Sequence, residues 1–331
     1  MQEHLDPILK IAGALAAVYI ALSSFADIKL TTKLKVLAVL LIGIISIGIL
    51  CWPLVAPEDP FGVVSLTAGS LNIKGIAILA IVAFVTGLIS SFISRPKSIQ
   101  IAPLAVPAGL AVWAIRSGNV TYLMRKDPTA AQRFLLFKEL KWEPIFWLII
   151  ISIGFAGVLI GLFLQSKKVR TEEEPLTRKA SNFVNTLIVV LACSLIAYLG
   201  IKIFAQNVMM PDNKFGSVLA QPATGQIVFA VITSFAVAGF LSKKFLDTGY
   251  IWPITASALV PILVISSKIN IDAIEYLTRK YPAVFFPDVI ASILPIQMAV
   301  FAVLGSIAGY WLAVSFDLWR KQELNEQKDL A

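Results

Sequence analysis

The chain has 331 residues, of which 58% are hydrophobic and only 15% are charged. Soluble proteins carry about 45–50% apolar and about 25% charged residues, so the composition argues against the two soluble domains that this length would allow. The net charge of +8 does not indicate a nucleic-acid partner, because the basic residues form no soluble basic domain. Lysines and arginines beside membrane spans explain the charge.

The amino-terminal segment, residues 1–33, contains an apolar stretch over residues 7–26. Glu3 and Asp6 precede this stretch, whereas a secretory signal begins with a cationic region, so we expect the segment to be retained. It either spans the membrane or lies along its surface, and Lys10 leaves both alternatives open.

Long apolar segments follow along the rest of the chain. Residues 145–164, for example, carry no charge over about 20 positions, which is enough to cross a bilayer as a helix. The sequence therefore predicts an all-α polytopic membrane protein. The expected spans are residues 34–56, 73–94, 98–115, 145–164, 183–204, 225–242, 248–267 and 289–315.

The chain contains an internal repeat. The stretches YLMRKDP (122–128) and YLTRKYP (276–282) share five of seven letters at an offset of 154 residues. The same offset relates PEDPFG (57–62) to PDNKFG (211–216) and Pro107 to Pro261. We interpret residues 34–164 and 183–315 as two four-helix copies. Because four spans is an even number, the sequence predicts parallel repeats, related by an axis along the membrane normal.

The most polar stretch of the chain, residues 165–182, joins the two copies. We expect it to be a solvated linker in the cytoplasm, because the positive-inside rule favours that side for its lysines and arginines. The same rule places the carboxy-terminal tail, residues 316–331, in the cytoplasm. The loops around Asp59 and Asp127 are then expected on the opposite side of the cell membrane.

Each copy carries an arginine–lysine pair at equivalent positions, Arg125–Lys126 and Arg279–Lys280. Guanidinium and ammonium groups bind phosphates and carboxylates, so these four residues are candidate ligands of an anion. As an anion site, the two pairs are expected to converge across the repeat axis. Two alternatives stay open. In the first, the pairs end short surface helices and point toward lipid headgroups. In the second, the acids Glu58, Asp59 and Asp212 neutralise the pairs.

The third apolar segment of each copy contains two prolines. They are Pro103 and Pro107 in the first copy, and Pro253 and Pro261 in the second. Proline removes a helical hydrogen bond, and in lipid such breaks lie within protein or line a cavity. Matching breaks in two halves are typical of a transport site, which Trp113, Thr255 and Ser257 would help to line. The alternative is a pair of kinks packed against neighbouring helices.

The last span of each copy carries small residues at helical spacing, Gly157 with Gly161 and Gly305 with Gly309. We expect these GxxxG faces to let helix backbones approach closely. The two motifs do not align at the offset of 151 residues that relates Pro144 to Pro295, so they are not interpreted as one inherited site.

Motifs for catalysis are absent from the sequence. It has no P-loop, dinucleotide fingerprint, paired-aspartate motif or HExxH. The only histidine is His4, and Cys51 and Cys193 lie in apolar segments without a CxxC partner, which argues against haem, zinc and thiolate sites. No Asp or Glu lies in the middle of an expected span, so a proton relay is not indicated. We expect neither an enzyme nor a cofactor.

Two functional hypotheses remain. The first is a transport or solute-binding protein with a site between the repeats, for an anionic or lipidic solute. The second is a non-catalytic subunit that anchors a larger membrane complex. The expected partners are membrane lipids and possible further membrane subunits, and no nucleic acid.

Overall fold

The computed structural model describes residues 30–59, 61–67, 69, 71–95, 98–127, 129–166, 183–281 and 283–329. The expectations for residues 1–29 and for most of the linker therefore lie outside the described residues. Within them the protein is mostly helical, and seven helices are long and apolar enough to cross a membrane. The prediction of a polytopic helical membrane protein is confirmed at this level.

The first half, residues 30–166, begins with one apolar helix that changes its winding along its length. The helix starts as α2 (Leu30–Gly43), continues as the π-helical η1 (Ile44–Leu50) and ends as the 3₁₀ turn η2 (Trp52–Leu54). The remaining elements are α3 (Ile73–Ile93), α4 (Ser98–Ile101), η3 (Ala102–Leu104), α5 (Ala105–Arg116), α6 (Val120–Lys126), α7 (Ala130–Leu140) and α8 (Glu143–Ser166).

The second half, residues 183–329, contains a small sheet in addition to its helices. Its elements are α9 (Phe183–Phe204), β1 (Met209–Asp212), β2 (Gly216–Ala220), α10 (Thr224–Leu246), α11 (Ile251–Lys268), α12 (Ile271–Lys280), β3 (Phe285–Phe286), η4 (Val289–Ser292) and α13 (Pro295–Asp329). Strands β1 and β2 form an antiparallel hairpin, and β3 pairs with β2 through Leu219 and Phe286. This small sheet, in an otherwise helical protein, was not predicted from the sequence.

Glycines allow close helix packing in both halves. A Cβ built on Gly157 of α8 would lie 2.1 Å from the carbonyl oxygen of Phe84 on α3. A Cβ on Gly309 of α13 would lie 2.0 Å from the carbonyl oxygen of Ala236 on α10. Only residues without a side chain fit so close to a neighbouring backbone. The packing role predicted for the GxxxG faces is confirmed.

The third apolar segment of the first half differs from the expected full-length span. Pro103 lies in η3, a 3₁₀ turn that separates the short α4 from α5, so the apolar helix covers only Ala102–Arg116. Seven long helices therefore replace the eight expected. From residue 98 to residue 116 the segment would rise about 28 Å at about 1.5 Å per residue, close to the thickness of a bilayer core. That residues 34–164 cross the membrane four times therefore stays a prediction.

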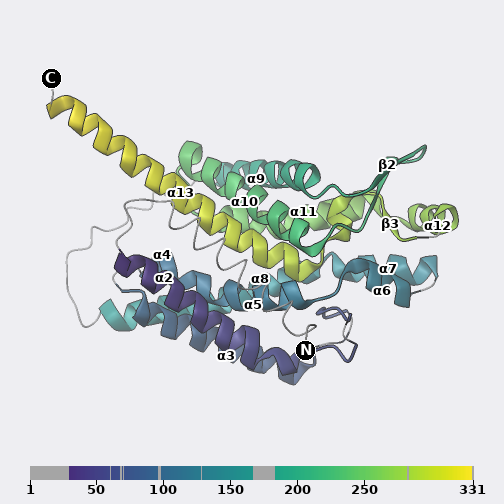
Figure 1. The fold of residues 1–331 in the computed structure, drawn as a ribbon, viewed down its shortest axis with the longest axis horizontal. Helices are drawn as coiled ribbons and strands as arrows, with labels where there is room; N and C mark the ends of the chain where they lie inside the picture. Colours follow the sequence, from purple (N-terminus) through teal and green to yellow (C-terminus); the bar gives the residue numbers. More distant parts are fainter. Residues whose placement is uncertain are drawn as a thin grey trace.

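The chain is elongated, and its two ends differ in character (Figure 1). One end carries α6, α7, α12 and the sheet, whereas the carboxyl end of α13 projects at the other. Along the middle, α13 packs against α5 and α8, which joins the two halves. We call the first of these ends the cap.

Candidate functional site

Two short helices of the cap, α6 and α12, each begin after an asparagine whose side chain binds the first turn of the helix. The side chain of Asn119 accepts a hydrogen bond from the Tyr122 N–H at the start of α6, and that of Asn270 accepts one from the Ala273 N–H at the start of α12. Such caps replace the backbone partners that the first turn of a helix lacks. Helix α12 is amphipathic: it buries Ala273, Ile274 and Leu277 and packs against α7 of the other half.

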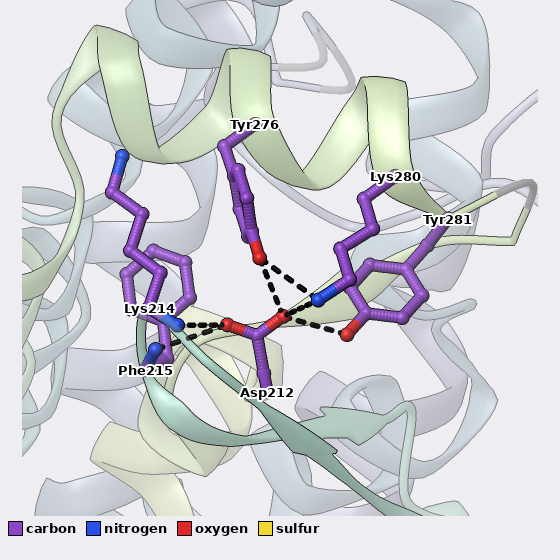
Figure 2. A network of polar contacts seen from close by, with 6 residues as sticks. All are labelled: Asp212, Lys214, Phe215, Tyr276, Lys280 and Tyr281. Atoms are coloured by element: carbon purple, nitrogen blue, oxygen red, sulfur yellow. Dashed lines mark hydrogen bonds and ion pairs between the residues drawn. The ribbon is translucent and has the colours of Figure 1, made fainter.

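Asp212 is the centre of a polar network in the cap (Figure 2). Its side chain is fully buried at the end of β1, and its Oδ2 lies 2.7 Å from the Lys280 Nζ. The hydroxyls of Tyr276 and Tyr281 donate to the same oxygen over 3.0 and 2.7 Å. The backbone amides of Lys214 and Phe215 donate to Oδ1 over 2.8 and 3.0 Å. The carboxylate therefore fixes the hairpin turn and holds it against α12.

The electrostatics of this network favour its charged form. Burial raises the pKa of Asp212, but hydrogen bonds from Lys280, Tyr281 and the two amides outweigh that effect and hold it well below its usual range. The hydrogen bond to Asp212 raises the pKa of Lys280 above its usual range, and it also raises the pKa of Tyr281. Asp212 and Lys280 thus stay charged at neutral pH.

A related contact occurs in the first half. The Tyr122 hydroxyl donates to the Asp59 Oδ2, and the Phe61 N–H donates to the Asp59 Oδ1 over 3.0 Å. The hydrogen bond from Tyr122 lowers the pKa of Asp59. Lys126 lies over the Tyr122 ring, with its Nζ 4.9 Å from the centroid. In both halves, a tyrosine of the YLxRKxP stretch reaches the acid that follows the first span.

The four basic candidates lie in the cap but not in one cluster. Lys280 pairs with Asp212, and Arg279 pairs with Glu275 one turn earlier on α12. Arg125 and Lys126 are exposed at the end of α6. Within the described residues, no hydrogen bond or ion pair joins the two arginine–lysine pairs. In the second half, therefore, acidic side chains of the same half neutralise the arginine and the lysine, which was one of the alternatives to an anion site.

The proline candidates lie within the helices of the bundle. Pro103 lies in η3, Pro107 and Pro253 lie in the first turns of α5 and α11, and Pro261 lies inside α11. A proline in a first turn removes no helical hydrogen bond, so Pro107 and Pro253 do not break their helices.

The polar candidates near these prolines either form hydrogen bonds within their own helix or are buried. The hydroxyls of Thr255 and Ser257 each donate over 2.7 Å to a carbonyl of their own helix. The Trp113 side chain is fully buried, and its Nε1 has no hydrogen-bond partner in the structure. These residues do not line the groove in the cap that is described next.

A groove of 180 Å³ opens in the cap between the two halves. It lies between α7 and the last turn of α11, and Lys141 Nζ donates to the Ser266 Oγ across it over 3.2 Å. Apolar side chains and two lysines form its walls. The lining residues are Phe134, Phe137, Lys138 and Lys141 from the first half, and Ile265, Ser266 and Ile269 from the second.

No protein-family model matches the chain, and the curated proteins and solved structures give no match either. Among the described residues, no group of three or more His, Cys, Asp or Glu side chains could hold a metal ion.

Sequence reasoning missed the residues that line the groove. Its signal was a Lys-x-x-Lys-Trp pattern, Lys138 to Trp142, directly before an apolar span. The central role of Asp212 was missed as well. There the signal was Tyr281, which replaces Asp127 in the otherwise similar repeat stretch.

Proposed function

We propose that the protein is a non-enzymatic integral protein of the cell membrane that binds an anionic or lipidic solute between its two halves. The observation that carries this proposal is the groove between α7 and α11, because both halves contribute to its walls. Apolar walls with a few placed polar groups are typical of small-molecule sites. Lys138 and Lys141 supply positive charge, and Ser266 supplies a hydroxyl.

The test is whether purified protein retains a bound solute. The chain would be purified in mild detergent, and the compounds that copurify would be measured by native mass spectrometry. We expect one class of anionic or amphipathic compound at about one copy per chain. Replacement of Phe134 by Trp, which fills the groove without changing its charge, should remove that compound. Equal retention by the wild type and F134W would exclude the groove as the binding site, and the absence of any retained compound would refute the proposal.

The arginine–lysine pairs are a second candidate location for an anion. Arg125 and Lys126 have exposed charges at the same end of the molecule, which supports this location less strongly than an enclosed groove would. The double variant R125Q/R279Q tests it separately. Reduced retention of the solute by R125Q/R279Q, with unchanged retention by F134W, would place the ligand at the pairs.

The alternative function is that of an anchoring subunit in a larger complex, and one observation favours it. Helix α13 is 35 residues long, and its carboxyl end projects beyond the other helices (Figure 1). Phe316, Leu318 and Trp319, near the end of the candidate span Pro295–Arg320, expose apolar surface. Exposed apolar surface of this kind marks contact sites with lipid or protein. Copurification of a membrane protein that is lost in the double variant L318S/W319S would support the subunit hypothesis.

We also infer that the halves are parallel repeats, with the linker and the carboxyl terminus in the cytoplasm. Two features support this inference. The helix pairs α3–α8 and α10–α13 each pack through glycines, and each half links a cap tyrosine to an acid. The cap would then face the outside.

A further inference from the structure

We infer that the groove binds the phosphate headgroup of an anionic membrane phospholipid. This inference rests on the proposed function and names the ligand class of that site. It depends on three properties of the groove, which are its charge, its depth relative to the spans, and the apolar surface that continues below it.

The charge of the groove is positive. Lys138 and Lys141 are three positions apart at the end of α7, so they lie on one face of the helical turn. Lys138 makes no hydrogen bond or ion pair within the part of the chain that the structure describes. Lys141 uses one of its three donors on Ser266, whose own hydrogen is then free to donate. None of the described acidic side chains lines the groove, and Glu139 is exposed outside it. The site is therefore complementary to an anion.

The depth of the groove corresponds to the headgroup layer. Lys141 lies two residues before the start of α8, and Ser266 lies two residues before the end of α11. Two spans of different halves thus end at the same level, beside the groove. Trp142, 54% exposed, follows Lys141, and tryptophan beside lysine at a span end is typical of the membrane–water interface.

The apolar surface below the groove fits acyl chains. Ile145 and Ile149 lie one turn apart on α8 and are 38% and 53% exposed, and Leu263 on α11 is 55% exposed. Ile145 follows Lys141 by four positions and Leu263 precedes Ser266 by three, so these exposed side chains continue from the groove along both spans. The groove has a volume of 180 Å³, which leaves room for a phosphate group. A phospholipid uses both surfaces, whereas free phosphate uses only the lysines.

The experiment compares lipids that differ in charge. Full-length protein would be equilibrated in nanodiscs that contain equal amounts of phosphatidylglycerol and phosphatidylcholine, and the lipids retained after extraction would be measured by native mass spectrometry. We expect the wild type to retain phosphatidylglycerol preferentially. In K138Q/K141Q, we expect that preference to fall by at least about 10-fold. The matched control is K74Q, because Lys74 is an exposed lysine at the start of α3, in a span end outside the groove.

Each outcome bears on one of the two proposals. Equal retention of both lipids by the wild type would overturn the anionic headgroup but leave a lipid-binding groove. Retention of neither lipid would overturn the lipid headgroup, whereas the absence of any copurifying solute would overturn the proposed function. An unchanged preference in K138Q/K141Q, or an equal loss in K74Q, would overturn the assignment of the lysines. Full displacement of the retained lipid by millimolar inorganic phosphate would identify a free anion as the ligand.

Circular dichroism and gel filtration would verify that each variant is folded. The variant S266A keeps both lysine charges, so it should reduce the preference for phosphatidylglycerol by only about 2-fold.

Discussion

The hydroxyl of Tyr276 donates a 3.0 Å hydrogen bond to the carboxylate of Asp212, 64 positions earlier in the chain. Lys280 and Tyr281 bind the same carboxylate oxygen. Two segments separated by two membrane spans, α10 and α11, are thereby held together outside the apolar bundle. The repeated YLxRKxP stretch thus has a structural role in the second half, because its tyrosine and its lysine both bind an acid of the same half.

The Asp212 network should contribute to stability. Replacement of Asp212 by Asn keeps the shape but removes the charge that Lys280 faces, and it leaves three donors competing for a weaker acceptor. We expect the midpoint of thermal unfolding in detergent to fall by roughly a few degrees. Replacement of the exposed Glu58 by Gln is the control and should leave the midpoint unchanged. A D212N midpoint equal to that of E58Q would show that the network is dispensable.

The pH dependence of the network follows from its shifted pKa values. Because the pKa of Asp212 is lowered on folding, its stabilising effect is present above the ordinary carboxyl pKa of about 4 and is lost as the pH falls below it. Because the pKa of Lys280 is raised, its effect is complete below about pH 10 and is lost at higher pH. The difference in unfolding midpoint between the wild type and D212N should be constant from pH 5 to about pH 9 and should shrink below about pH 4. A difference that changes steadily between pH 5 and 9 would contradict this assignment.

The glycine contacts between α10 and α13 should tolerate no added side chain. A methyl group on Gly309 would meet the Ala236 carbonyl oxygen, so G309A should lower the free energy of unfolding by about 1–3 kcal/mol. Gly225 offers a matched control at the start of α10, where nothing lies within 4 Å of an added Cβ. G225A should be neutral or slightly stabilising, because alanine favours the helix. Denaturant titration of both variants provides the measurement, and equal losses in the two would refute the packing argument.

The hydroxyl of Ser306 should cost stability rather than add to it. Ser306 is fully buried in α13, and its Oγ has no hydrogen-bond partner in the structure. An unsatisfied buried hydroxyl carries a desolvation penalty, so S306A should raise the free energy of unfolding by about 0.5–1 kcal/mol. S257A removes a hydroxyl that does donate to a backbone carbonyl and should show no such gain. A clear loss in S306A would indicate an unseen partner for this hydroxyl.

The topology can be tested by labelling single cysteines with an impermeant reagent. Cysteines at Asp59 and Asp127 should react from the outside of intact cells, and cysteines at Glu173 and beyond Trp319 should react only after permeabilisation. Cys51 and Cys193 are buried, so their background reaction should be low. Labelling of positions 127 and 173 from the same side would exclude four complete spans in the first half.

The sequence by itself determined the membrane-embedded helical class, because unbroken apolar segments of span length have no other stable form in lipid. It also identified the glycine faces, since small residues at helical spacing favour close contact wherever helices pack. It predicted eight spans, whereas seven described helices are long enough to cross a membrane and the segment expected at 98–115 is divided by a 3₁₀ turn at Pro103. The sequence located Pro103 and Pro107, but local pattern does not say where the chain changes from a 3₁₀ turn to an α-helix.

Only the tertiary structure decided how the charged residues are used. Lys280 is adjacent to Arg279 in sequence, yet one binds buried Asp212 and the other an exposed neighbour on its own helix. Lys280 reaches Asp212 because of where the β1–β2 hairpin lies, and the pairing of β2 with the distant strand β3 sets that position. The same holds for the groove, where Lys141 meets Ser266 across 125 positions. The pattern of apolar residues in the sequence indicates which residues are buried or face lipid. A polar site depends instead on directional contacts between distant segments, which only the folded chain brings together.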